Sequence, residues 1–153
     1  MASAGPTLRQ RAVALLARRE HSRAELARKL ARFAQDPAEI EPVLDELARR
    51  RLLSDERFAE ARAQSLGARF GAARLEHELR TRGVDAAAIA RVTAAARASE
   101  IDRARAAWHK RFGGRAPASA AERAKQARFL QGRGFSFEAI RRVVGGTGDG
   151  ELD

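Results

Sequence analysis

The sequence predicts an all-α protein made of three tandem three-helix repeats. Aromatic residues make up only 5% of the chain and Tyr is absent, which disfavours a β-sandwich or a β-barrel. No segment alternates apolar and polar residues as a half-buried strand does. Helix-start signals recur instead along the chain, so we expect about nine helices in an elongated array that curves to the right or to the left.

The first repeat shows how each helix is read from the sequence. Its first helix is expected at residues 7–19, where a short apolar run ends in charged residues. Ser22 opens a capping box that starts the second helix. Asp36 starts the third, with Pro37 at the first helical position, where its missing N–H does no harm. Apolar residues at helical spacing follow at Ile40, Val43, Leu44 and Leu47.

The second and third repeats follow from internal similarity. A shift of 49 residues places Leu26, Leu30, Asp36, Ile40 and Val43 on Leu75, Leu79, Asp85, Ile89 and Val92. A further shift of 51 places Leu79, Gly83, Val84, Asp85, Ile89 and Val92 on Leu130, Gly134, Phe135, Ser136, Ile140 and Val143. Gly83 and Gly134 stand where a helix needs a left-handed C-terminal cap, whereas the first copy has Ala34.

The remaining helix starts complete the array. First helices are expected at 54–69 and 99–112, and further N-cap candidates are Ser54, Asp85, Ser119 and Ser136. We therefore expect repeat 1 at 1–53 with a short flexible N-terminus, repeat 2 at 54–98, repeat 3 at 99–145, and a flexible glycine-rich and acidic tail at 146–153.

The residue inventory argues against catalysis. The chain has no Cys, which removes disulfides, thiolate chemistry and the usual structural zinc sites. His21, His77 and His109 belong to different expected helices without carboxylates at metal-ligand spacing. A Walker-type phosphate loop is absent. We expect a protein that is not an enzyme, with no catalytic, cofactor-binding or metal-binding residues.

The sequence also lacks a secretory apolar region and an apolar run of about 20 residues that could span a membrane. Because Cys is absent as well, we expect a cytoplasmic protein without a membrane partner.

The charge balance indicates a polyanionic partner. Thirty basic against twenty acidic residues give a net charge of +10, which favours nucleic acid or a protein–nucleic acid assembly. Only Lys29, Lys110 and Lys125 are lysines, so an arginine excess from genomic base composition is an open alternative.

Positive charges recur at equivalent positions of the repeats, and such a stripe would bind phosphates. The candidate contacts to nucleic acid or to a filament are Arg23, Arg28, Lys29, Arg32, Arg74, Arg80, Arg82, Lys125, Arg128, Arg133, Arg141 and Arg142. The alternative is a solvated face without a binding function.

Aromatic side chains could stack on bases, but most lie on apolar stripes. Core packing is expected for Phe33, Phe58, Phe112 and Phe129. For Phe70 and for the pair Phe135 and Phe137, which lie near helix junctions, both interpretations stay open.

Several segments resemble the RecX family of bacterial recombination regulators. They are residues 18–26 with Lys29-Leu30, residues 53–59, Arg69-Phe70-Gly71 through Glu78-Leu79, Gly83-Val84-Asp85, Arg128-Phe129-Leu130, Arg133 to Phe137, and Ile140 to Val143. The resemblance covers roughly residues 8–145 in order. It departs from the family at Ala34, where Gly is usual, and at Phe70, where Tyr often precedes Gly.

The resemblance implies a non-enzymatic regulator of the RecA recombinase, with roles in DNA recombination, DNA repair and the SOS response. Family members bind the RecA–single-stranded DNA filament and inhibit its extension, ATP hydrolysis, strand exchange and co-protease activity. The implied partners are the RecA filament, single-stranded DNA and, more weakly, duplex DNA, and the protein is expected to be a monomer. Binding in the filament groove and capping of the filament end stay open.

Two alternatives of other classes are an independent helical DNA-binding regulator and a purely structural helical scaffold.

Overall fold

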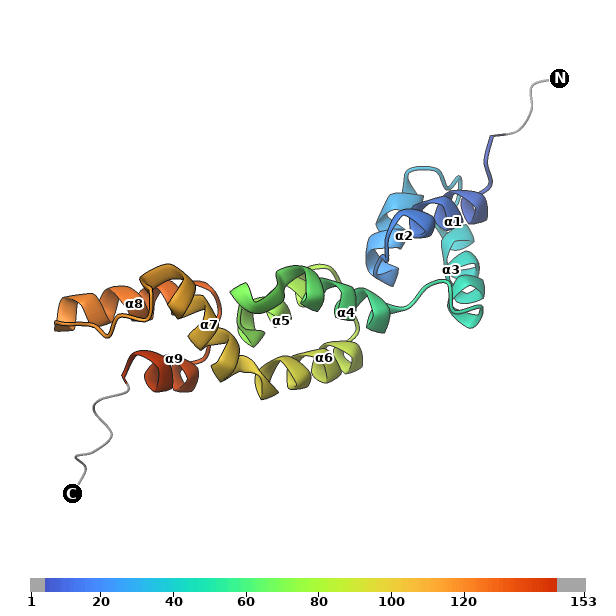
Figure 1. The fold of residues 1–153 in the computed structure, drawn as a ribbon. Coiled ribbons are helices and arrows are strands. Elements are labelled where there is room, and N and C mark those ends of the chain that lie inside the picture. Colours follow the sequence, from blue (N-terminus) through green and yellow to red (C-terminus); the bar gives the residue numbers. More distant parts are fainter. Residues whose placement is uncertain (1–4, 146–153) are drawn as a thin grey trace. The chain divides into compact units, whose positions relative to one another are not determined.

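The computed structural model describes residues 5–145, and this part of the chain contains nine α-helices, two short 3₁₀ helices and no strand (Figure 1). The prediction of an all-α protein with three three-helix repeats is therefore confirmed. The predicted tail at 146–153 and the first four residues of the expected flexible N-terminus lie outside the described residues. The limits drawn between repeats and the curvature of the array stay predictions.

The chain divides into two compact units, and the division passes through the middle repeat. The first unit contains the described residues up to Ala61 together with Leu79–Ile89. The second contains Arg62–Glu78 and the described residues from Ala90 onward. Each unit thus combines one terminal repeat with part of the middle repeat.

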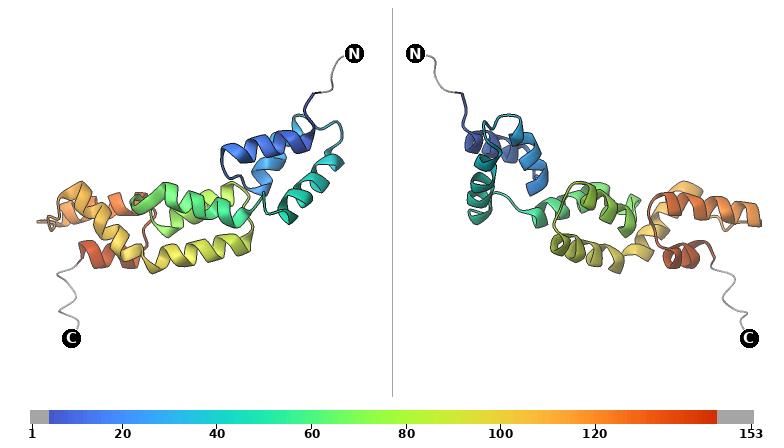
Figure 2. Two further views of the ribbon diagram at one scale, coloured as in Figure 1. Left: turned by 45° about the vertical axis from the view of Figure 1, so that its right-hand side comes forward. Right: turned by 180° about the vertical axis from the view of Figure 1, so that it is seen from behind.

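The first unit contains a complete three-helix group. Its helices are α1 (Leu8–Arg18), α2 (Arg23–Ala31) and α3 (Ile40–Arg49), with the 3₁₀ helix η1 (Pro37–Glu39) before α3. The three helices contact one another and lie side by side in every view (Figure 2). Their core contains Ala12, Leu26, Leu30, Ile40, Leu44, Leu47 and Leu53. The apolar stripe predicted for the third helix thus faces this core, because Ile40, Leu44 and Leu47 are buried.

The middle repeat supplies α4 (Asp55–Leu66), the 3₁₀ helix η2 (Gly67–Arg69), α5 (Ala72–Thr81) and α6 (Ala86–Ala98). The last group contains α7 (Glu100–Phe112), α8 (Ala120–Gly132) and α9 (Phe137–Val144), which contact one another in the second unit. The core of this group contains Ala104, Ala107, Leu130, Phe135, Ala139, Ile140, Val143 and Val144.

All six predicted N-caps form, but Asp36 caps the 3₁₀ helix η1 and not α3, which begins at Ile40 without a side-chain cap. The side-chain oxygen of each accepts a backbone N–H two or three residues ahead, at 2.9–3.2 Å, for Ser22, Asp36, Ser54, Asp85, Ser119 and Ser136. The reciprocal half of the capping box at Ser22 is missing, because the Glu25 carboxylate pairs with Arg19 and Lys29 instead. A complete capping box forms at Thr7 with Gln10, which the sequence reading did not single out.

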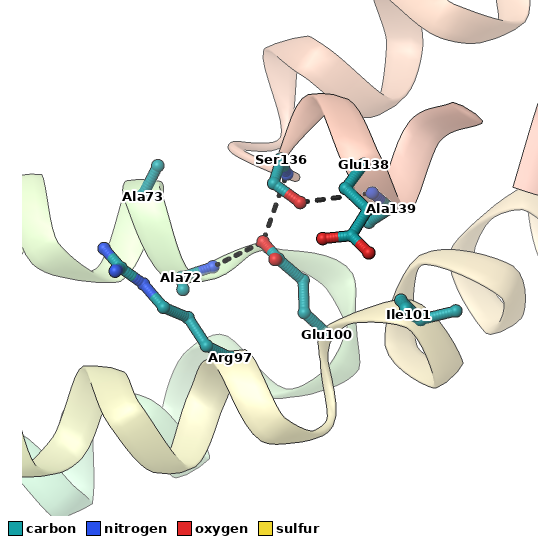
Figure 3. A pocket seen from close by; sticks show the side chains of 8 residues that line it. All are labelled: Ala72, Ala73, Arg97, Glu100, Ile101, Ser136, Glu138 and Ala139. Carbon is teal, nitrogen blue, oxygen red and sulfur yellow. Dashed lines mark hydrogen bonds between the residues drawn. The ribbon is translucent and has the colours of Figure 1, made fainter. Parts of the chain in front are cut away.

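A carboxylate links consecutive repeats in each unit, half-buried at Asp55 and buried at Glu100. In the first unit, the Asp55 carboxylate accepts the backbone N–H of Arg23 at 2.7 Å and that of Asp85 at 3.0 Å. In the second, Glu100 Oε1 accepts the N–H of Ala72 at 3.3 Å and that of Ser136 at 3.2 Å (Figure 3). Asp55 is the first residue of α4 and binds the starts of α2 and α6, and Glu100 is the first residue of α7 and binds the starts of α5 and α9. Each carboxylate thus joins its own repeat to the repeat before it.

A second contact recurs beside each carboxylate. The Ser22 hydroxyl donates to the Arg82 carbonyl at 2.7 Å, and the Gly71 N–H donates to the Arg133 carbonyl at 2.8 Å. These two pairs are related by the same shifts of 49 and 51 residues that align the repeats. We call the set of contacts around Asp55, and the equivalent set around Glu100, the inter-repeat joints.

Two glycines make these joints possible. Gly83 and Gly134 have φ of +72° and +83°, which confirms the predicted left-handed caps. A Cβ on Gly83 would lie 2.5 Å from Ala24 Cβ, and one on Gly134 would lie 2.5 Å from Arg74 Cβ. The backbone therefore approaches the start of the preceding repeat's second helix more closely than any side chain would allow.

We expect Glu100→Ala to destabilise the protein by about 1–3 kcal/mol, because two N–H groups at a buried joint lose their acceptor. Urea unfolding followed by circular dichroism measures this change. The matched control is Glu138→Ala, which removes an exposed carboxylate that lines a pocket together with Glu100 (Figure 3) and, within the described residues, pairs with Arg142. Its expected loss is about 0.5 kcal/mol or less. Equal losses for the two variants would contradict the role of Glu100.

Candidate nucleic-acid interface

The predicted basic residues are divided equally between the two units. The first unit holds Arg23, Arg28, Lys29, Arg32, Arg80 and Arg82, and the second holds Arg74, Lys125, Arg128, Arg133, Arg141 and Arg142. That they form one continuous stripe stays a prediction.

Two of these arginines are occupied by carboxylates. Arg23 forms ion pairs with Glu41 and Asp45 at 2.5 and 2.7 Å, and hydrogen bonds to these carboxylates raise the pKa of its guanidinium. Arg142 pairs with Glu138 one helical turn away at 3.3 Å. A carboxylate partner reduces the charge that a side chain offers to an external anion, so these two are weaker candidates than the sequence suggested.

Lys29 is partly exposed and contacts two buried polar residues of the first unit, His21 and Glu25. Its ammonium donates to His21 Nε2 at 2.9 Å and lies 3.8 Å from Glu25, which also pairs with Arg19. Burial lowers the pKa of His21, whose Nδ1 lies 3.0 Å from the Arg19 carbonyl. Burial alone would raise the pKa of Glu25, but the Arg19 hydrogen bond and the nearby positive charges lower it. Lys29 thus links His21 to Glu25.

Most of the other candidates are exposed. Arg28, Arg32, Lys125, Arg128 and Arg141 have no carboxylate partner within the described residues. Arg80 is exposed near the end of α5, and the Arg82 carbonyl takes part in the first joint. Arg74 is exposed and lies over the Phe70 ring at 5.1 Å.

Arg133 is the candidate that the fold brings together with other cations. It lines a cleft of about 370 Å³ in the second unit with Arg69 from η2 and with Lys110 and Arg111 from α7. The rest of the cleft wall is apolar and consists of Ala68, Ala106, Ala107 and Phe129. We call this the basic cleft.

The arginines of the basic cleft lie over aromatic rings. The Arg133 guanidinium is 4.8 Å from the Phe129 ring centre and 5.3 Å from that of Phe70. Arg111 lies 5.9 Å from the Phe129 ring centre and 5.4 Å from that of Phe112. Such contacts hold a guanidinium beside a ring, and its N–H groups can still donate hydrogen bonds, as one of Arg133 does to the Arg69 carbonyl.

The basic cleft brings four cations together without a carboxylate partner among the described residues. Carboxylates pair with Arg9, Arg19, Arg23, Lys29, Arg50, Arg57, Arg62, Arg97, Arg105 and Arg142. None pairs with the four cations of the cleft in the part of the chain that the structure describes. Four like charges around one cavity favour the binding of an anion.

Sequence reasoning found Arg133 but missed Arg69, Lys110 and Arg111. Lys110 and Arg111 lie in the last turn of α7, where basic residues also stabilise the helix dipole. Arg69 directly precedes the Phe70-Gly71 pair. Residues 69, 110 and 133 are too far apart in sequence for any periodicity to group them.

The expectations for the aromatic residues are partly confirmed. Phe58 is buried, and Phe112 and Phe129 are half-buried and pack edge to face at 5.4 Å. The prediction for Phe33 was wrong: its side chain is 51% exposed, and the Arg11 guanidinium covers the ring at 3.8 Å. A cation from α1 occupies the place where core contacts were expected. Of the open pair, Phe135 is buried and Phe137 is exposed.

The described residues contain no group of three His, Asp or Glu side chains placed to hold a metal ion. Between residues 5 and 145, none of the helices has the length and apolar character needed to cross a membrane.

Family models match three successive parts of the chain. The first three-helix domain of RecX matches residues 9–47, the second matches 54–92 and the third matches 98–144.

Curated relatives support the same assignment. The regulatory protein RecX of Leptothrix cholodnii is 49% identical over 94% of this chain and 92% of its own length. That of Chromobacterium violaceum is 46% identical over 99% of this chain and 98% of its own.

Solved structures share the fold. The crystal structure of RecX from Lactobacillus salivarius has a TM-score of 0.78 at 16% identity and covers 91% of this chain and 93% of its own. A second crystal structure of a regulatory protein RecX has a TM-score of 0.72 at 17% identity, over 89% of this chain and 72% of its own.

The pKa of His21 is lower in the folded protein than its ordinary value of 6.5. We therefore expect the free energy of unfolding to decrease as the pH falls from 6.5 towards that lower pKa. In this pH range the unfolded chain binds a proton at His21, whereas the buried imidazole stays neutral. The contribution of His21 to the free energy of unfolding is therefore complete above pH 6.5 and is lost below it. Urea unfolding at a series of pH values measures the slope. His21→Gln should flatten this slope, whereas the control His109→Gln, at an exposed position, should not. An unchanged slope in His21→Gln would contradict the assignment.

Proposed function

The chain belongs to the RecX family of regulatory proteins, and on this premise we propose that it binds the RecA–single-stranded DNA filament and inhibits its activities. The inhibited activities would be filament extension, ATP hydrolysis, strand exchange and co-protease function. In this proposal the protein acts by binding alone, in the cytoplasm and as a monomer. The observation that carries the proposal is the match of all three family domains in order, supported by relatives almost half identical along nearly the whole chain.

The distribution of charge supports a role in binding a large polyanion. Exposed cations without carboxylate partners are present in both units, for example Arg28 and Arg32 in the first and Lys125 and Arg128 in the second. Two binding units on one chain raise each other's effective concentration at the target, so contacts that are weak singly can add up to tight binding. A filament offers repeated copies of such contacts, whereas a single small ligand does not.

The proposed inhibition needs no chemistry from this chain. A regulator that occupies contacts on a filament can hinder the addition of further recombinase and the structural changes that accompany ATP hydrolysis. Release of counterions from DNA phosphates would make the binding weaken as salt rises. Contacts to recombinase side chains would be less sensitive to salt, so the salt slope separates the two contributions.

The alternative is an independent DNA-binding regulator built from three-helix units. The same exposed cations would support it, but its binding would not depend on recombinase. Measuring the affinity for bare single strands, for duplex DNA and for the recombinase-coated strand distinguishes the two functions.

We expect titration of this protein into cognate RecA to reduce single-strand-dependent ATP hydrolysis at ratios well below one to one. The assay follows ADP release on a pre-formed filament and, separately, during assembly. Stronger inhibition during assembly would indicate capping of filament ends, and equal inhibition would indicate binding along the groove. No inhibition at substoichiometric ratios would overturn the proposal.

A charge-reversal variant tests the predicted contacts. The variant combines Arg74→Glu, Arg80→Glu, Lys125→Glu and Arg128→Glu. We expect it to bind the filament about tenfold more weakly or worse, with a smaller salt dependence, because phosphate contacts are lost. The matched control combines Arg18→Glu, Arg105→Glu, Arg115→Glu and Arg123→Glu, which changes the net charge equally at exposed positions with the same division between units. Equal binding by the two variants would show that bulk charge, not these positions, matters.

A further inference from the structure

We propose that the basic cleft of the second unit is a binding site for a nucleotide, with its phosphate held by the cations and its base against the apolar wall. The inference deepens the proposed function, on which it rests for its biological setting, by naming the ligand chemistry of one surface. The nucleotide could be one unit of a single strand or a free nucleoside polyphosphate, and both present the same base and phosphate.

The size and lining of the basic cleft fit such a ligand. Its volume of about 370 Å³ falls in the range of about 300–1,000 Å³ typical of small-ligand clefts, which combine an apolar lining with a few convergent polar groups. Ala106, Ala107 and Phe129 provide the apolar part, and Arg69, Lys110, Arg111 and Arg133 provide the polar part. A simple anion such as phosphate would leave the apolar wall uncovered.

The charges of the basic cleft are left without internal compensation. Ion pairs neutralise many basic residues elsewhere in the chain, including the half-buried pair of Arg62 with Glu78 in the same unit. The four cleft cations have no carboxylate partner in the part of the chain that is described, although they face a common cavity. Their mutual repulsion is relieved when an anion enters, which is the arrangement found in phosphate-binding sites.

The second inter-repeat joint fixes the cleft before any ligand binds. The Arg133 guanidinium donates to the Arg69 carbonyl at 3.3 Å, and the Arg133 carbonyl accepts the Gly71 N–H at 2.8 Å. Arg103, whose pKa is lowered by burial, donates to the Phe70 carbonyl between them. Two of the four cations therefore lie on segments that are hydrogen-bonded to each other, which reduces the conformational entropy of the backbone lost on binding.

Aromatic and guanidinium groups beside the cleft favour a base over an acidic side chain. The Arg133 and Arg111 guanidinium groups lie over the Phe129 ring at 4.8 and 5.9 Å. A base that enters the cleft would meet these planar groups, and base stacking on aromatic and arginine planes is the common mode of single-strand recognition. Acidic peptides can pair with the cations but have no planar base to place on these groups.

The test measures binding of a fluorescein-labelled oligothymidylate to the full chain by fluorescence anisotropy, without any recombinase present. Lys110→Gln with Arg111→Gln should weaken binding about tenfold and reduce the salt slope, because two phosphate contacts are lost. The control Arg105→Gln with Arg123→Gln removes the same charge from exposed positions of α7 and α8 that do not line the cleft, and it should change binding little. Circular dichroism verifies that both variants are folded.

Competitors identify the source and chemistry of the ligand. Displacement of the oligothymidylate by a nucleoside triphosphate would show that free nucleotides enter the cleft, whereas displacement only by unlabelled strand would assign it to nucleic acid. An abasic oligomer should compete less well than oligothymidylate, since it lacks the base. Equal competition by the abasic oligomer or by polyglutamate, or equal weakening by the control variant, would overturn the proposal. Because recombinase is absent, failure here leaves the proposed regulation intact, and a lack of ATPase inhibition would not affect this result.

Discussion

The carboxylate that opens each following repeat is the interaction on which the rest of this fold depends. Asp55 and Glu100 each accept backbone N–H groups from the starts of two other helices. Those N–H groups have no partner inside their own helices, so the carboxylate satisfies them and its negative charge lies near the positive ends of the helix dipoles. A three-helix group of about 45 residues buries little apolar surface by itself, and the joint gives its helix starts a partner in the neighbouring repeat.

The joint also explains why the compact units do not coincide with the repeats. Residues 79–89, which contain Gly83 and Asp85, belong with the first repeat, whereas residues 62–78 belong with the third. Each half of the middle repeat is held by a different carboxylate. The middle repeat is therefore shared between two bodies, because its second helix starts at one joint and ends at the other.

Binding groups are placed by the same contacts that hold the repeats together. In the second unit, the backbone around Gly71 and Gly134 approaches so closely that a Cβ on Gly71 would lie 2.3 Å from the Gly134 carbonyl oxygen. This approach brings η2 next to the end of α8 and so places Arg69 beside Arg133. Some basic residues are thus neutralised by carboxylates, others are exposed without a carboxylate partner in the described part of the chain, and Arg69 and Arg133 meet at the joint in a cleft that Lys110 and Arg111 also line.

The sequence by itself determined the helices, their starts and the repeat register. N-caps such as Ser22 and Ser136, and left-handed glycines such as Gly83, act on residues close by in the chain. They can therefore be recognised from the sequence alone. Only the tertiary structure decided which partner a side chain takes when several partners distant in sequence compete for it. Glu25 left its capping box for Arg19, Phe33 came to lie under Arg11, and Arg69, Lys110 and Arg111 joined Arg133 across some sixty residues of chain. The physical reason is that a charge or a ring has several partners of similar energy, and the packing of the helices selects among them.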